Sequence, residues 1–214
     1  AEFMTINQHD IHITKQARYM ILGDKKSDNL LYVLHGYGHL ATYFAKKFEE
    51  LIKLGYCIVV PEGLHRFYLQ GASGRVGASW MTKEQREVDI QDNLNYLDQL
   101  HDLNIANNTY KTVSILGFSQ GGATAARWAI HSKQSFTKII LWACVFPEDM
   151  KIKFSLPNQA LVEKHFVVGD EDEYFKGNTL DKMINYYEEL DFSVTLYHGK
   201  HQINQQTLID LFQV

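Results

Sequence analysis

The stretch SILGFSQGGA, residues 114–123, holds a G-x-S-x-G motif between an apolar, strand-like run and a helix-forming run. This order is typical of a sharp strand-to-helix turn, which presents one strained residue at the top of a sheet. Here that residue is Ser119, and Gly117 and Gly121 stand where larger side chains would collide inside the turn. Free N–H groups of the following helix can hold an anion. We interpret Ser119 as a nucleophile that attacks a carbonyl carbon; the alternative is a glycine-rich turn that contains a serine by chance.

A serine nucleophile needs a general base, and the base needs an orienting carboxylate; in this type of turn both follow the serine along the chain. An apolar strand pattern over Lys164–Val168 leads into the acidic loop GDEDE, residues 169–173. A second pattern over Phe192–Tyr197 leads into the loop HGKH, residues 198–201. Because the carboxyl ends of parallel strands share one edge of a sheet, both loops are expected beside the serine.

Each of these loops offers two candidates. Asp172 lies three residues past the loop glycine, far enough to reach a neighbouring loop, whereas Asp170 leaves directly from the strand end. His201 lies beyond a glycine on its own loop, whereas His198 is still close to strand geometry. We therefore predict Asp172 and His201 as the acid and the base, with Asp170 and His198 as the alternatives.

An acyl-transfer site also needs donors for the oxyanion. One should be the backbone N–H of Gln120, directly after the nucleophile, and the other should come from the loop after an early core strand. The uncharged run Leu30–Leu34 predicts that strand, and HGYG follows it at residues 35–38. Its glycines let the backbone approach a substrate oxygen, which makes the N–H of Tyr37 the second candidate. Taken alone, HGYG could be an ordinary turn; its position ahead of G-x-S-x-G makes it specific.

The order HGYG, GFSQGG, GDEDE and GKH resembles an α/β-hydrolase. The GFSQGG form, together with Ala78-Ser79-Trp80, resembles the phospholipase/carboxylesterase family, which includes acyl-protein thioesterases and small bacterial carboxylesterases. The resemblance runs from about Leu30 to the C-terminus. Family members commonly have a proline after the catalytic aspartate, where this chain has Glu173. The resemblance implies hydrolysis of carboxylic esters or thioesters, with the functional roles carried onto Ser119, Asp172, His201, Tyr37 and Gln120.

Predicted strands and helices alternate along the chain, which favours a mostly parallel central sheet with helices on both faces. We predict a single α/β-hydrolase domain over residues 4–214 without a large cap domain, and we interpret residues 1–3 as a vector remnant. The pattern also predicts a leading hairpin from His9–Thr14 and Arg18–Leu22, and a closing helix over Asn204–Phe212.

The longest stretch without a regular pattern is Pro61–Met81, which should begin at the carboxyl end of a core strand. Long loops in compact domains are usually functional or disordered, and apolar side chains on such a loop can receive an acyl chain. We predict Phe67, Leu69, Trp80 and Phe146 as pocket residues of an open groove for short to medium acyl chains. The alternative is that these side chains only pack their segments onto the domain.

Composition and charge restrict the class of protein further. The 214 residues are 45% apolar and 21% charged, with a net charge of −4, which is typical of globular proteins. The Lys and Arg residues are scattered, which argues against nucleic acid as a partner, and the longest apolar run, Ile139–Phe146, is too short to cross a bilayer. Cys57 and Cys144 lie in apolar strand patterns without C-x-x-C spacing, and no signal segment follows Met4. We therefore expect buried free thiols in a cytoplasmic enzyme.

No metal and no other cofactor are expected, because none of the close histidine pairs sits on a helix at i, i+4 with a glutamate between, and none is joined by a cysteine cluster. The expected partner is a small-molecule acyl ester or thioester. Three other possibilities stay open: a lysophospholipase, a lactone or aryl-ester hydrolase on the same triad, and a non-catalytic hydrolase-like binding protein. The closely spaced histidine pairs considered for a metal site are His9/His12, His35/His39 and His198/His201.

Overall fold

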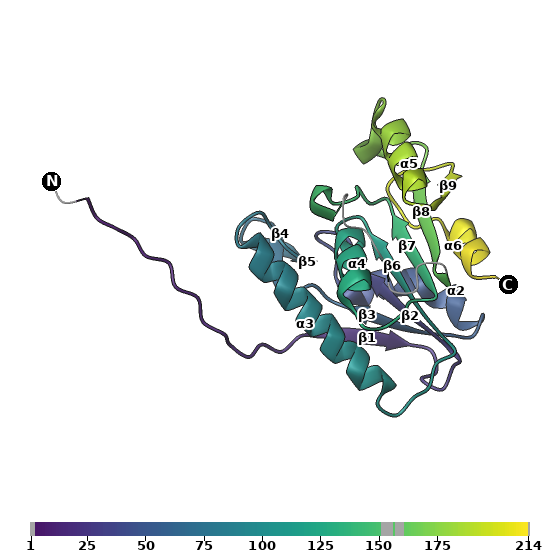
Figure 1. Ribbon diagram of the computed structural model, residues 1–214, viewed down its shortest axis with the longest axis horizontal. Helices are drawn as coiled ribbons and strands as arrows, with labels where there is room; N and C mark the ends of the chain where they lie inside the picture. Colours follow the sequence, from purple (N-terminus) through teal and green to yellow (C-terminus); the bar gives the residue numbers. More distant parts are fainter. Residues whose placement is uncertain (1–2, 151–155, 157–160, 214) are drawn as a thin grey trace.

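The computed structural model describes residues 3–150, 156 and 161–213. Its centre is a seven-stranded sheet in the order β1-β3-β2-β6-β7-β8-β9 (Figure 1). Only β1 runs antiparallel to its neighbour, which confirms the mostly parallel sheet predicted from the sequence. The strands are β1 (Tyr19–Leu22), β2 (Asn29–Leu34), β3 (Tyr56–Pro61), β6 (Thr112–Phe118), β7 (Lys138–Trp142), β8 (Glu163–Gly169) and β9 (Ser193–Tyr197).

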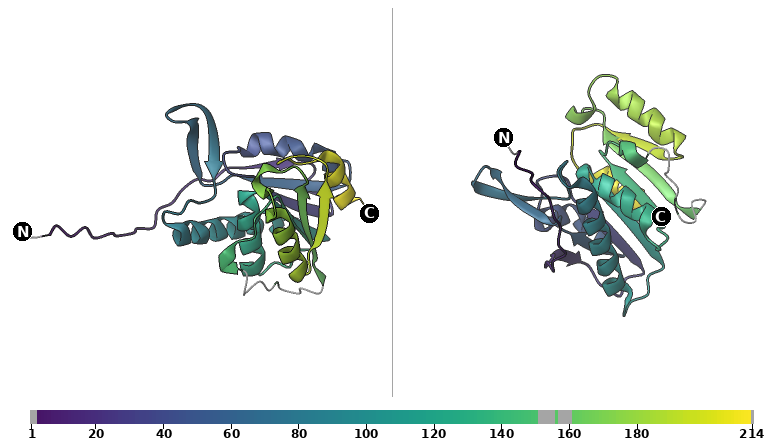
Figure 2. Two further views of the ribbon diagram at one scale, coloured as in Figure 1. Left: turned by 90° about the horizontal axis from the view of Figure 1, so that it is seen from above. Right: turned by 60° about the vertical axis from the view of Figure 1, so that its left-hand side comes forward.

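Helices cover both faces of this sheet, as a buried parallel sheet requires. Seen along the sheet, α3, α4 and α5 lie on one side and α1, α2 and α6 on the other (Figure 2). None of the helices in the described residues is both long enough and apolar enough to cross a membrane. The helices are α1 (Ala41–Ala45), α2 (Glu49–Ile52), α3 (Arg86–Ile105), α4 (Gln120–His131), α5 (Thr179–Glu189) and α6 (Gln205–Phe212).

Strand register brings the predicted loops to one edge. β2 pairs with β6 so that Leu34 lies opposite Gly117, and the HGYG loop therefore leaves the sheet beside the serine turn. β8 pairs with β9 so that Gly169 lies opposite Tyr197, and the acidic and histidine loops therefore leave together. Buried aliphatic side chains along these central strands fix the register, because a slip of one residue would move every side chain to the other face.

The predicted leading hairpin is wrong. Residues 3–18 form no strand and lead from β1 to an N-terminus that extends away from the domain, and only β1 joins the sheet, paired with β3 (Figure 1). Ile11 and Ile13 gave the segment its strand-like alternation, but they are 85% and 79% exposed. A strand that buries none of its apolar side chains gains too little free energy to offset the ordering of its backbone.

The stretch Pro61–Met81 is not an irregular loop either. It contains β4 (His65–Gln70) and β5 (Ser73–Ser79), which pair antiparallel as a separate hairpin that projects from the domain (Figure 2). The turn between them contains Gly71 and leads to Gly74, both at positive φ (73° and 86°), which residues with a side chain rarely adopt. The frequent glycines in this stretch suggested an irregular loop, although two of them, Gly71 and Gly74, allow the hairpin turn.

Candidate active site

Ser119 occupies a strained turn between β6 and α4. Its φ of 54° and ψ of −119° lie outside the regions that residues with a side chain normally populate. Such a conformation costs on the order of 1–3 kcal/mol and persists only where the surroundings hold it. The Ser119 N–H donates to the carbonyl of Trp142 at 2.8 Å. A Cβ on Gly117 would lie 2.4 Å from the Gly121 oxygen, and one on Gly121 would lie 2.3 Å from the Leu34 oxygen, so both glycines are required.

His201 and Asp172 form a hydrogen-bonded pair beside this turn. The distance from His201 Nδ1 to Asp172 Oδ2 is 2.8 Å, and the Asp172 side chain is fully buried. The other carboxylate oxygen, Oδ1, accepts from the Tyr174 N–H at 2.9 Å. The His201 ring centroid lies 4.8 Å from that of Phe118, the residue directly before Ser119. If Nδ1 donates to the carboxylate, Nε2 is left unprotonated and can accept a proton.

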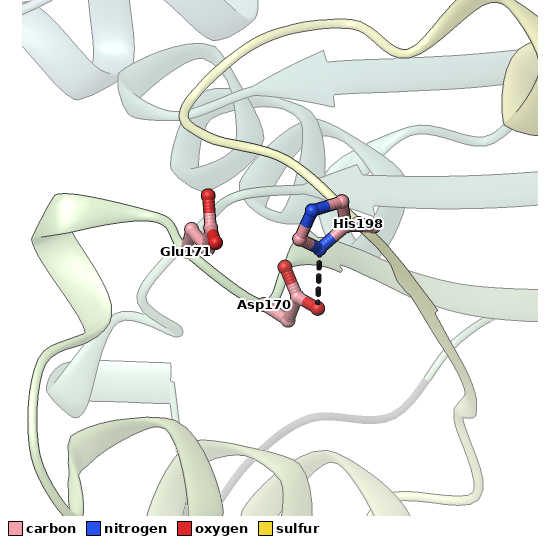
Figure 3. A group of neighbouring side chains, drawn as sticks. All are labelled: Asp170, Glu171 and His198. Atoms are coloured by element: carbon pink, nitrogen blue, oxygen red, sulfur yellow. Dashed lines mark hydrogen bonds and ion pairs between the residues drawn. The ribbon is translucent and has the colours of Figure 1, made fainter.

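The alternative candidates form a second, separate pair at the surface (Figure 3). His198 Nδ1 lies 3.1 Å from Asp170 Oδ2, and the two side chains are 81% and 45% exposed. Their hydrogen bond raises the pKa of His198 and lowers that of Asp170. Glu171 lies close enough that these three side chains could ligate a metal ion. All three are exposed, and exposed acidic groups are common without a bound ion.

The predicted oxyanion donors lie on adjacent pieces of backbone. Because Gly121 has no side chain, its backbone packs directly against the carbonyl groups of Leu34 and His35, and the start of α4 lies against the end of β2. Within the described residues, the hydrogen bonds of the backbone leave the N–H groups of Tyr37 and Gln120 unused. Free backbone donors on adjoining segments are one requirement of an oxyanion hole.

The HGYG loop also pairs with the β4–β5 hairpin. The Gly38 N–H donates to the Ala78 carbonyl at 2.9 Å, and the Ala78 N–H donates to the His39 carbonyl at 2.8 Å. Gly77 packs so closely that an added Cβ would lie 2.3 Å from the Gly38 oxygen. The hairpin therefore continues into the loop that carries the Tyr37 N–H.

His35, the first residue of HGYG, has a structural role that its place in the motif does not indicate. Its Nδ1 lies 2.8 Å from the Gly36 carbonyl, and its Nε2 accepts from the Gly63 N–H at 2.9 Å. This arrangement assigns the proton to Nδ1 of a neutral ring. Burial in the core lowers the pKa of His35 to about 4. The ring therefore stays neutral at physiological pH and holds the HGYG loop.

Trp80 connects this loop to the serine turn. Its Nε1 donates to the His35 carbonyl at 2.8 Å, and its ring stacks on that of His35. The Trp80 N–H donates to Gln120 Oε1 at 3.0 Å, and Gln120 Nε2 donates to the Met81 carbonyl at 2.9 Å. Trp80 is completely buried. Its position favours the alternative role considered above, an anchor for its segment.

The other predicted pocket residues divide into two groups. Phe146 is fully buried and packs edge-to-face against Tyr187, away from solvent. Phe67 is half-buried with its ring 5.1 Å from that of Tyr37, and Leu69 is 39% exposed. The hairpin side chains thus lie beside the HGYG loop, where a ligand can reach them.

A cavity of about 450 Å³ opens elsewhere, beside the acidic loop. Asp172 lines it, but Ser119, His201 and the four predicted pocket residues do not. Carboxylates and two lysines supply most of its polar groups, which does not suit an acyl chain. We therefore do not assign it to the reacting acyl group. Its lining residues are Asp170, Glu171, Asp172, Glu173, Phe175, Lys176, Gly177, Leu180, Asp181 and Lys200.

Comparison with known proteins identifies the class. Solved structures with the same fold include acyl-protein thioesterase 2 of Zea mays, with a TM-score of 0.69, 14% identity, and coverage of 92% of this chain and 96% of that one. A Bacillus cereus carboxylesterase has a TM-score of 0.64, 14% identity and 92% coverage of both chains. Esterase PE8 has a TM-score of 0.61, 16% identity, and coverage of 92% and 96%. No curated protein matches the sequence.

The fold and its serine turn are therefore those of an α/β-hydrolase. The sequence model of the phospholipase/carboxylesterase family matches residues 16–213, and the chain belongs to that family. The protein is an esterase-type hydrolase.

Proposed function

We propose that the protein hydrolyses carboxylic esters or thioesters through an acyl-serine intermediate, with Ser119 as nucleophile, His201 as general base and Asp172 as the orienting carboxylate. One observation carries this proposal. A buried carboxylate lies 2.8 Å from the His201 imidazole, and that imidazole contacts the ring of Phe118, the residue directly before a strained serine at a helix N-terminus. Each group has the environment that its role requires.

In the first step, Ser119 Oγ attacks the acyl carbon while His201 Nε2 takes the hydroxyl proton. Asp172 keeps the imidazole oriented through Nδ1 and stabilises the cation that forms. The tetrahedral adduct then collapses, the leaving group takes the proton from Nε2, and acyl-Ser119 remains. Water repeats the sequence in the second step and releases the acid.

The N–H groups of Tyr37 and Gln120 are proposed to hold the oxyanion in both steps. The support is their free backbone donors on adjoining segments and the buried contacts of His35 and Trp80 that fix those segments. A single such donor contributes on the order of 10²- to 10³-fold in rate.

For the acyl group, we propose an open groove that takes short to medium chains. The support is the position of Phe67 and Leu69 beside the HGYG loop, with both side chains within reach of solvent. Each buried methylene contributes roughly 0.8 kcal/mol, so even a short groove gives a clear preference for chain length.

The two cysteines, Cys57 and Cys144, are buried free thiols, which fits the cytoplasm as the proposed location.

A fluorophosphonate probe and a panel of p-nitrophenyl esters, thioesters, lactones and lysophospholipids test the proposal. The wild type should be labelled on Ser119, and Ser119→Ala should lose both labelling and turnover while keeping its circular dichroism spectrum. Ser193→Ala, which changes an exposed serine on β9, serves as the control and should behave as wild type. Substantial turnover by folded Ser119→Ala would overturn the assignment. A wild type that folds, stays unlabelled and turns over nothing would instead favour a non-catalytic binding protein.

A further inference from the structure

We propose that Tyr174 forms the leaving-group side of the active site and favours esters or thioesters whose leaving group is aromatic or bulky and apolar. The inference rests on the proposed acyl-serine mechanism and adds a substrate preference to it. Two properties of this side chain carry it: its ring centroid lies 4.4 Å from the His201 ring, and yet the residue is 64% exposed.

The acidic loop fixes Tyr174 in this place. Its N–H donates to Asp172 Oδ1 at 2.9 Å, and the same carboxylate holds His201 through Oδ2. The next residue, Phe175, is buried against Phe166 and anchors the short 3-10 helix Glu173–Phe175 from the other side. One carboxylate therefore positions both the imidazole and the backbone that carries the tyrosine ring.

Within the described residues, the aromatic neighbours of His201, Phe118 and Tyr174, differ in accessibility. Phe118 lies 4.8 Å from the imidazole and is only 3% exposed, so protein closes that side. Tyr174 lies at a similar distance on an accessible part of the surface. A substrate group that approaches His201 can therefore meet the tyrosine ring but not the phenylalanine ring.

The chemistry brings the leaving group to this ring. When the adduct collapses, the bond from the acyl carbon to the leaving oxygen or sulfur breaks, and that atom receives the proton from His201 Nε2. The leaving atom must then lie within roughly 3 Å of Nε2. The rest of the leaving group extends from that atom, next to an exposed ring already in contact with the imidazole. Aromatic contacts of this kind change kcat/KM by roughly two- to tenfold.

Benzyl and methyl esters of the same acid test the preference. The two alcohols have similar acidity and both esters give the same acyl-Ser119, so deacylation is common to both and the ratio of their kcat/KM values reports acylation. We expect Tyr174→Ala to lower the benzyl-to-methyl ratio by roughly two- to tenfold, and Tyr174→Phe to keep it. Tyr43→Ala is the matched control, because Tyr43 is equally exposed, at 65%, and its ring contacts Lys46.

The outcomes separate this inference from the mechanism beneath it. If Tyr174 only supports the loop, Tyr174→Ala will slow both esters equally, and the unchanged ratio overturns the proposal. If the ratio falls just as much in Tyr43→Ala, the effect is not local and the proposal is again wrong. Failure of the mechanism would look different. The fluorophosphonate probe would then leave wild-type Ser119 unlabelled, whichever ester is used to measure turnover.

Discussion

The indole nitrogen of Trp80 lies 2.8 Å from the carbonyl oxygen of His35, to which it donates a hydrogen bond in the protein interior. This contact joins the segment after β5 to the loop after β2, and the backbone of Trp80 joins both to Gln120. The two backbone donors proposed for the oxyanion therefore belong to segments held by one buried residue, Trp80, through its indole and its backbone N–H.

Trp80→Phe should keep a smaller aromatic ring at this position and remove this hydrogen bond. The unpaired His35 carbonyl should lower the free energy of unfolding by roughly 1–3 kcal/mol. A displaced loop donor should lower kcat on the order of tenfold, with KM little changed, because the oxyanion forms only during the reaction. Denaturant unfolding and steady-state kinetics measure both effects. A folded variant with wild-type kcat would show that Trp80 does not position the HGYG loop for catalysis.

Trp80→Ala tests the pocket interpretation separately. Because the side chain is closed to solvent, we expect a lower rate with every p-nitrophenyl ester and no change in the preference for acyl-chain length. A flattened preference would mean that substrate does reach the indole and that Trp80 lines the groove.

Asp172→Asn should lower kcat/KM on the order of 10³- to 10⁴-fold, because an amide can hold the imidazole in the wrong tautomer and cannot stabilise its cation. Asp170→Asn should stay within a few-fold of wild type, since Asp170 pairs with the exposed His198. Kinetics of the two purified variants with one ester provide the comparison. A larger loss in Asp170→Asn would reassign the acid.

Stability should fall in mild acid because His35 is buried as a neutral ring with a pKa lowered to about 4. The unfolded chain, with an ordinary histidine pKa of roughly 6.5, then binds more protons than the native state between these two values. The contribution of His35 to the free energy of unfolding is therefore fully present above roughly pH 6.5. It falls by up to roughly 3 kcal/mol as the pH is lowered towards 4.

Urea unfolding at several pH values measures this slope. His35→Gln should be less stable at neutral pH but should show a shallower loss on acidification. An unchanged slope in this variant would assign the acid sensitivity to other histidines, such as the buried His101 and the half-buried His165, whose pKa values desolvation also lowers.

The serine turn should not tolerate a methyl group on its inner side. Gly121→Ala would bring a Cβ to 2.3 Å from the Leu34 oxygen, in rigid backbone, so we expect loss of folded protein or of activity. Gly71→Ala meets no atom within 4 Å and strains only its positive φ of 73°. It should retain activity and lose about 1 kcal/mol of stability. Equal behaviour of the two variants in thermal unfolding and turnover would contradict the packing argument.

Sequence patterns predicted the parts of the site that follow from strand order. The turn at Ser119 has a motif that only a few backbone geometries satisfy, and parallel strands bring their carboxyl ends to one edge. Spacing along the two loops also selected Asp172 and His201, the residues that the structure brings within 2.8 Å of each other. Their catalytic roles stay predictions until the variants are measured.

Contacts between distant segments were not predictable in the same way. Nothing in the local pattern around Trp80 shows that its indole meets the carbonyl of His35, 45 residues earlier. An exposed tyrosine such as Tyr174 resembles any other surface residue in the sequence, and only the folded loop places its ring on His201. The alternation of Ile11 and Ile13 resembled a strand, but pairing depends on a surface to cover them, which local sequence does not report.

The pairing of Gly38 and His39 with Ala78 makes the HGYG loop an edge of the β4–β5 hairpin. The backbone proposed to bind substrate and the backbone proposed to stabilise the transition state therefore form one continuous hydrogen-bonded stretch. If acyl chains bind along the hairpin, a change at its outer end will reach the Tyr37 donor through the ladder as well as through the substrate. Exchange of this hairpin between family members should therefore alter the catalytic rate together with chain-length selection, so that the two properties evolve as a linked pair.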